Sequence, residues 1–143
     1  MSRLSSEKSY SLGEHNKEKR LMAEGMAGDL AMVISPTTIA PAPTSSAWTR
    51  TVSIQITNTS GEVMTWLNDV YATTLSVGNT STAGTASIAS TTLTIVNGVA
   101  DVVVSGDAQD WLDTETDTLT IANITIMGYT VTGGTSVETF TAM

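Results

Sequence analysis

Carboxylates are concentrated in one short segment of the chain, residues 107–117. The segment contains Asp107, Asp110, Asp113, Glu115 and Asp117. Several hard oxygen ligands in one loop are what Ca²⁺ requires. The segment nevertheless lacks the ligand order and the mid-loop glycine of an EF-hand. We therefore expect a solvated acidic loop with no bound metal and no other cofactor, and a calcium site is the alternative.

Other residue types that could perform catalysis are sparse. His15 is the only histidine, and it stands close to Lys17 and Lys19. A Ser-His-Asp set is easy to assemble from so many serines, but no nucleophile-elbow motif is present. Paired carboxylates that cleave glycosides need a cleft with aromatic platforms, and the chain has only three Trp, three Tyr and one Phe. The sequence predicts a protein that is not an enzyme.

The three tryptophans, Trp48, Trp66 and Trp111, are the second candidate for a binding site. Aromatic rings stack on sugars, so these side chains could form a carbohydrate-binding face. Tryptophan in a β-sandwich more often packs at the edge of the core. We expect packing, and glycan binding through the loops near Trp66 and Trp111 is the alternative.

These residues must be positioned by strands, and the strongest strand signal is the segment 91–105. Two apolar runs meet there at Asn97-Gly98, a dipeptide that favours a two-residue hairpin turn. Such a turn gives a register with one apolar face, because it pairs Ile95 with Ala100 and Leu93 with Val102.

Alternating apolar and polar residues predict a half-buried strand over Trp48–Thr57. In the predicted strand that follows residue 115, the alternation of apolar and polar residues shifts by one position after Ile121. This shift indicates a bulge or bend at Ala122 or Asn123. Pairing across Gly133-Gly134 would leave no apolar face, so the last strand is expected to pair elsewhere, as in Greek-key connections.

The other segments complete an all-β domain. A single helical turn pinned by Trp111 is expected between residues 106 and 117. Shorter strands fill most of the remaining sequence after Ala47. The fold class is therefore mainly β: an immunoglobulin-like antiparallel sandwich of about seven to nine strands over residues 47–143.

An N-terminal arm, residues 1–46, precedes this domain. Ser11 and Glu14 have capping-box spacing, and a helix is predicted over about residues 12–34. Its apolar residues are Leu12, Met22, Met26, Leu30 and Val33. A Pro-rich linker follows at 35–46. Because an amphipathic helix of this kind needs a surface, it packs either on its own β-domain or, as we expect, on another subunit.

Composition excludes several classes of partner. Residues 47–143 contain one cation, Arg50, and nine acids, so this domain repels nucleic-acid phosphates. No apolar stretch is long enough to cross a bilayer, and no secretory signal pattern is present. The chain also has no cysteine. We expect no nucleic-acid or membrane partner.

Three stretches resemble the bacterial immunoglobulin-like, invasin-type domains of bacteriophage structural proteins. They are WTRTVSIQITNTSGEVMTW, NTSTAGTASIASTTLTIVNGVADVVVSGDAQDW and TLTIANITIMGYTVTGGTSVETF, which together span most of residues 47–141. The resemblance implies a β-sandwich displayed on a virion. A single sandwich with its own arm differs from the tandem arrays of that family, and it suits a protein that attaches individually to a lattice.

The expected function is therefore that of a non-enzymatic virion structural protein, made in the host bacterial cytoplasm. A capsid decoration (cement) or head-fibre protein anchored through the arm is favoured over a tail accessory. The expected partners are phage capsid or other virion proteins and copies of the chain itself. The alternative is a surface adhesion module that binds a host-surface glycan.

Overall fold

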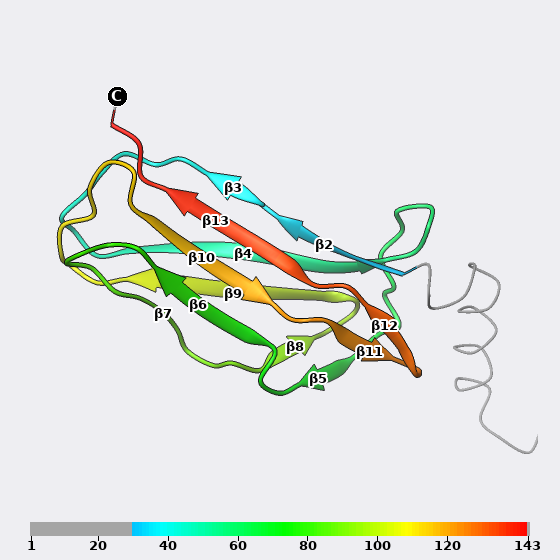
Figure 1. The fold of residues 1–143 in the computed structure, drawn as a ribbon. Helices are drawn as coiled ribbons and strands as arrows, with labels where there is room; N and C mark the ends of the chain where they lie inside the picture. The colour runs from blue at the N-terminus through cyan, green and yellow to red at the C-terminus, as the bar shows by residue number, and fades with distance from the viewer. Residues whose placement is uncertain (1–29, 143) are drawn as a thin grey trace, which may run out of the picture.

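The structure is a computed structural model that describes residues 30–142, and this part of the chain is mainly β (Figure 1). Its strands are β2 (Ala31–Ser35), β3 (Thr38–Ile39), β4 (Trp48–Thr57), β5 (Asp69–Tyr71), β6 (Leu75–Asn79), β7 (Ala86–Ile88), β8 (Leu93–Ile95), β9 (Val99–Gly106), β10 (Thr116–Ile121), β11 (Ile124–Ile126), β12 (Tyr129–Val131) and β13 (Gly134–Thr139). These residues contain no helix with the length and apolar character of a membrane span.

Two four-stranded sheets form the body of the molecule. One has the order β2-β4-β9-β7 and is antiparallel throughout. The other has the order β3-β13-β10-β6, in which only the short pair β3–β13 is parallel. The second sheet lies across the first in Figure 1, an arrangement consistent with a β-sandwich.

The segment before Trp48 belongs to these sheets. Ala31–Ser35 pairs along β4, so the prediction of a helix is wrong for residues 31–34. The expected linker at 35–46 contains β3, and Thr44 pairs with Trp111 through two backbone hydrogen bonds. Leu30, just before β2, is not helical either, and residues 12–29 of the predicted helix lie outside the described residues. Edge pairing with β4 decides the conformation of residues 31–35, because it satisfies backbone groups that a helix would otherwise have paired internally.

The turn at Asn97-Gly98 is present, but the hairpin is short. Both turn residues have positive φ, 53° and 82°, and Val96 pairs with Val99 in the predicted register. Beyond that pair the prediction is wrong, because β8 pairs with β5 while β9 joins β4 and β7. The four residues expected on the apolar face are nevertheless all buried: Leu93, Ile95, Ala100 and Val102.

The bend expected at 122–123 is confirmed. β10 ends at Ile121 and β11 begins at Ile124, and β12 and β13 are separated at a matching position. Asn123 accepts a hydrogen bond from the N–H of Gly133, which links the two breaks. The last strand, β13, pairs with β10 and not across Gly133-Gly134. The helical turn predicted around Trp111 is absent, because residues 107–115, between β9 and β10, form an irregular loop closed by the pairing of Trp111 with Thr44.

Candidate functional site

The inward face of β4 holds a charged side chain among apolar ones. Residues 48, 50, 52, 54 and 56 share this face because side chains alternate along a strand. Val52, Ile54 and Ile56 are fully buried there, and Arg50 is only 8% exposed. The same alternation on the opposite sheet turns Asp117 of β10 and Glu138 of β13 inward. The fold therefore buries one cation and two carboxyl groups between its sheets.

Arg50 connects the two sheets through several hydrogen bonds. Its Nε and Nη2 donate to Oδ1 of Asp117 at 3.1 and 2.7 Å. Its Nη1 donates to Oγ of Ser136 at 2.8 Å, and Nη2 also reaches the Ser136 carbonyl at 3.1 Å. The hydroxyl of Ser136 donates in turn to the carbonyl of Pro36, between β2 and β3. We call Arg50, Asp117, Ser136 and Glu138 the intersheet cluster.

The two acids of the intersheet cluster are directly opposite each other. Asp117 and Glu138 are paired residues on the neighbouring strands β10 and β13. Oε1 of Glu138 lies 3.6 Å from Nε of Arg50, too far for a strong hydrogen bond. Oδ2 of Asp117 and Oε1 of Glu138 have no hydrogen-bond partner among the described residues. One guanidinium thus faces two carboxyl groups that it satisfies only in part.

This environment raises the pKa of Glu138 to about 8. Burial is the largest cause, and hydrogen bonding to Asp117 and repulsion from its charge add to it. The attraction of Arg50 acts in the opposite direction. A carboxyl pair can exchange protons with a substrate only if the substrate reaches it, and Asp117 is 0% and Glu138 4% exposed. The intersheet cluster can hold a proton, and its carboxyl groups are closed off from solvent.

An aromatic cluster lies at one end of the same interior. Trp48, Trp111 and Phe140 have ring centroids 5.2 to 5.8 Å apart. Trp111 is fully buried and donates from Nε1 to the carbonyl of Asp107 at 3.1 Å. It packs on Gly84, where a Cβ would overlap the ring. The expectation that Trp48 and Trp111 pack in the core is confirmed, and Trp111 is not available to stack on a sugar.

Only two of the five residues expected to bind a partner, Leu30 and Val33, lie among the described residues. Leu12, Met22 and Met26 lie outside the described residues, as does His15. Leu30 is 6% exposed and packs in the core of this chain. Val33 lies on the edge strand β2 and is 44% exposed.

The acidic segment 107–117 is divided by the fold. Asp117 points into the intersheet cluster, whereas three others accept backbone hydrogen bonds: Asp107 from Thr85, Asp113 from Ala142, and Glu115 from Leu112 and Thr82. The hydrogen bond from Leu112, with smaller contributions from Thr82 and Ser81, lowers the pKa of Glu115. No group of three potential metal ligands occurs among residues 30–142. The carboxylates of Asp107, Asp113 and Glu115 therefore hold loop backbones in place through hydrogen bonds.

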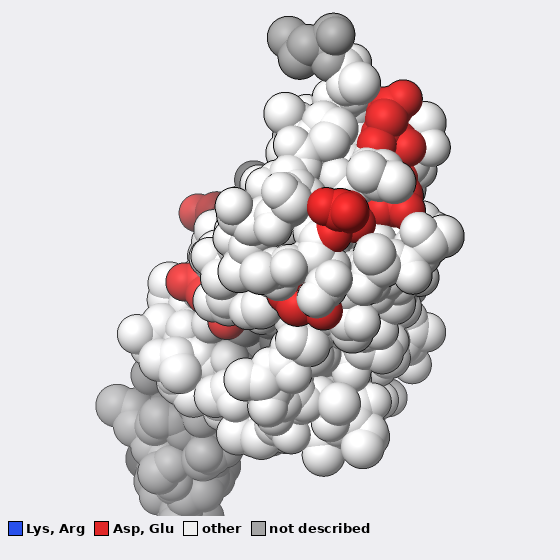
Figure 2. Space-filling view, turned by 90° about the vertical axis from the view of Figure 1, so that its left-hand side faces the viewer, with Lys and Arg blue, Asp and Glu red and all other residues white. Residues whose placement is uncertain are grey.

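The surface of the described residues is acidic. Figure 2 faces the end that carries residues 107–115 and shows carboxylates but no lysine or arginine. Arg50, which is buried, is the only Lys or Arg within residues 30–142.

An open hollow of about 200 Å³ lies where β8 and β9 diverge. Its lining includes Ser90, Thr92, Thr94 and Asp101, together with apolar side chains, and no aromatic residue. This lining lacks an aromatic platform for a sugar ring and a second charged group for catalysis.

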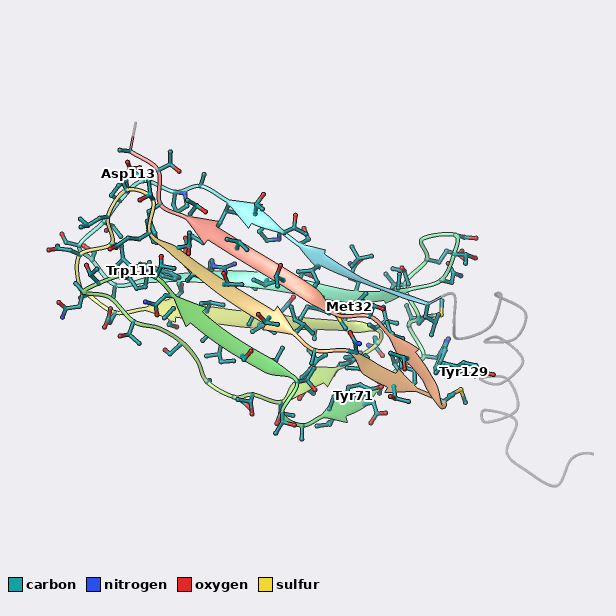
Figure 3. All side chains as sticks on the ribbon, in the orientation of Figure 1. Met32, Tyr71, Trp111, Asp113 and Tyr129 are labelled. Carbon is teal, nitrogen blue, oxygen red and sulfur yellow. The ribbon has the colours of Figure 1, made fainter. Side chains whose placement is uncertain are left out.

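Apolar side chains are exposed at the opposite end of the molecule. Met127 and Tyr129, at the tip formed by β11 and β12, are 46% and 43% exposed. Tyr129 and Trp111 mark the two ends in Figure 3. The chain enters β2 at the same end as this tip, because Ala31 pairs with Thr57 at the far end of β4 from Trp48.

The intersheet cluster was missed by the sequence analysis, although a signal for it exists. Arg50 occupies a position of the predicted strand Trp48–Thr57 at which the alternation calls for an apolar side chain. Glu138 stands two residues before Phe140, so both side chains are expected on the same face of a strand. A charge at an inward position of a strand predicts a buried partner of opposite charge. Asp117 was assigned instead to the solvated loop because its neighbours in sequence are acidic.

Comparison with known proteins does not assign the chain to a class. No protein-family model matches it, and no curated protein sequence shows significant similarity to it.

Proposed function

We propose that this chain is an immunoglobulin-like, non-enzymatic structural protein of a bacteriophage virion. Strand order supports the fold: β2, β4, β9 and β7 follow the A, B, E and D positions of an immunoglobulin sandwich. The strands β6, β10 and β13 correspond to C, F and G. The resemblance of residues 47–141 to immunoglobulin-like domains of phage structural proteins supports the virion assignment.

One observation carries the structural role. The described residues bury their convergent ionisable groups between two sheets, and the acids outside this cluster mainly hold loop backbones in place. An acidic, threonine-rich exterior favours solubility at high local concentration, as on a lattice of many copies. We infer that the protein contributes a stable module and an attachment segment, most simply as a capsid decoration or head-fibre protein.

The attachment segment in this proposal is residues 1–29. Strands β2 and β3 belong to the two sheets, so the boundary between anchor and body falls before Leu30 and not at residue 46. Residues 1–29 contain five of the six cations of the chain and the apolar residues Leu12, Met22 and Met26. The first described strand, β2, begins at the end where Met127 and Tyr129 are exposed, and in this proposal that end faces the virion.

The test is incorporation of truncated protein into particles. Deletion of residues 2–29 should leave unfolding of the β-body unchanged and abolish incorporation. A full-length variant with Leu12, Met22 and Met26 replaced by Ser should behave in the same way. Its matched control replaces Val103, exposed on β9, by Ser and should load normally. Normal loading of the folded truncation would refute the anchor, and absence of the native chain from purified virions would refute the virion role.

A surface adhesion module that binds a glycan is the second candidate. The exposed Tyr129 at the β11–β12 tip favours it, because aromatic rings stack on sugars. Trp111 cannot contribute, since it is buried. A glycan array probed with native protein and with Tyr129→Ser would decide between the two: sugar retained only by the native protein supports adhesion, and no retained sugar removes it.

A further inference from the structure

The intersheet cluster contains one more negative group than its cation can balance. Arg50 carries one positive charge, whereas ionised Asp117 and Glu138 would carry two negative charges. Burying an unbalanced charge costs several kcal/mol, so the interior favours the state in which one carboxyl is protonated. A proton between the two carboxyl groups also supplies the donor that Oδ2 of Asp117 and Oε1 of Glu138 lack.

The surroundings of the pair offer no other source of compensation. Glu138 faces Arg50 from β4 and Asp117 from β10, and Ser136 on its own strand already bonds to Arg50 and Pro36. The other buried polar side chains of the described residues are uncharged: Thr57, Asn58 and Thr74. On the facing sheet, Asp101 of β9 is exposed. The charge balance therefore depends on the proton.

We propose that Asp117 and Glu138 form a buried proton-binding site that is occupied at neutral pH, and that loss of this proton in mild alkali weakens the contact between the two sheets. Deprotonation leaves two carboxylates opposite each other on β10 and β13, with a single guanidinium between the sheets. Their repulsion acts on the strand pair that Arg50 ties to β4. This inference concerns the β-body alone and does not depend on the proposed virion role.

The direction of the pH effect follows from proton linkage. An acid whose pKa is higher in the folded than in the unfolded state binds its proton more tightly when folded. The free energy of unfolding then falls as pH rises from the ordinary carboxyl value of 4.5 to about 8, where Glu138 titrates in the folded protein. Tyr71 does not interfere in this window, because burial and Asp69 raise its pKa to about 12.

A site-specific titration tests the proton directly. In native protein with ¹³C-labelled glutamate, the side-chain carbon of Glu138 should titrate near pH 8, well above the ordinary carboxyl value of 4.5. In Asp117→Asn the midpoint of Glu138 should fall, because the repulsion is removed and Arg50 is left to Glu138 alone. Titration of Glu138 at the ordinary carboxyl value of 4.5 in the native protein would overturn the proposal.

Urea unfolding between pH 5 and 9 tests the consequence. The urea midpoint of native protein should decrease as pH rises, and that of Glu138→Gln should stay nearly constant, since glutamine keeps a donor but cannot ionise. Asp101→Asn, an exposed carboxylate on β9, should retain the native pH dependence. Equal pH dependence in native protein and Glu138→Gln would refute the linkage to stability. If Glu138→Gln does not fold, the titration of native protein decides alone.

Discussion

Replacing Arg50 by Met is expected to destabilise the β-body strongly. Methionine keeps an unbranched apolar stem of similar length and removes the guanidinium. Asp117, fully buried, then loses the two hydrogen bonds that Oδ1 accepts, and Ser136 loses the donors to its hydroxyl and carbonyl. Removing one partner of a buried ion pair costs about 3–5 kcal/mol. That is a large fraction of the roughly 5–15 kcal/mol that stabilises a typical domain.

The loss of unfolding free energy in Arg50→Met depends on the carboxylate charge that is left buried without a partner. Variants that also remove the carboxylates test this dependence. The triple variant Arg50→Met, Asp117→Leu, Glu138→Leu removes all three charged groups and should recover most of the loss, because apolar replacements of buried ion pairs are often neutral or stabilising. Arg50→Lys should fall between native protein and Arg50→Met, since an ammonium keeps the charge but not the forked donor geometry.

Urea unfolding at pH 6, followed by tryptophan fluorescence, measures these differences. Trp111 is fully buried and next to Trp48, so its emission reports loss of the core. Thr51→Ala, on the exposed face of the same strand, is the control and should change stability by less than about 0.5 kcal/mol. If Arg50→Met loses less than about 1 kcal/mol, or if the triple variant is no more stable than Arg50→Met, the reasoning from buried charge is wrong.

Three further substitutions have defined outcomes. Gly98→Ala should cost about 2 kcal/mol or more by urea unfolding, because φ is +82° and a Cβ would lie 2.5 Å from the Met64 carbonyl oxygen; an unchanged midpoint would contradict the turn geometry. Gly84→Ala should displace the ring of Trp111 and alter the near-ultraviolet circular dichroism; an unaltered spectrum would contradict that packing. Glu115→Gln should weaken the loss of stability in acid: a lowered pKa stabilises the folded state above the ordinary carboxyl range, and this contribution disappears as pH falls through the folded pKa. If the stability of Glu115→Gln falls in acid as much as that of native protein, Glu115 makes no such contribution.

Local signals predicted the features that depend on neighbours in the sequence. Strand β4 was predicted with its observed bounds, since alternation over ten residues suits a half-buried strand and excludes a helix. The turn at Asn97-Gly98 was predicted because it needs two residues with positive φ, which asparagine and glycine adopt most readily. The break after Ile121 is visible in the sequence because the apolar residues shift from alternate positions by one residue. Successive side chains of a strand point to opposite faces, so such a shift requires a bulge or bend.

Tertiary structure decided the pairing partners and the burial of charge. Leu30 and Val33 fit a helical spacing that predicts a helix up to residue 34, yet hydrogen bonding along the edge of β4 makes residues 31–35 a strand. Strands β8 and β9 separate after their turn because each has another strand to pair with.

The intersheet cluster shows the same division most clearly. Its members are 67 and 86 residues apart in sequence, measured from Arg50 to Asp117 and to Ser136. Alternation alone determined that Arg50 points inward, and this is a local property of one strand. Which carboxyl groups meet Arg50 depends on how two sheets are laid over each other, because no short-range interaction brings β4, β10 and β13 together.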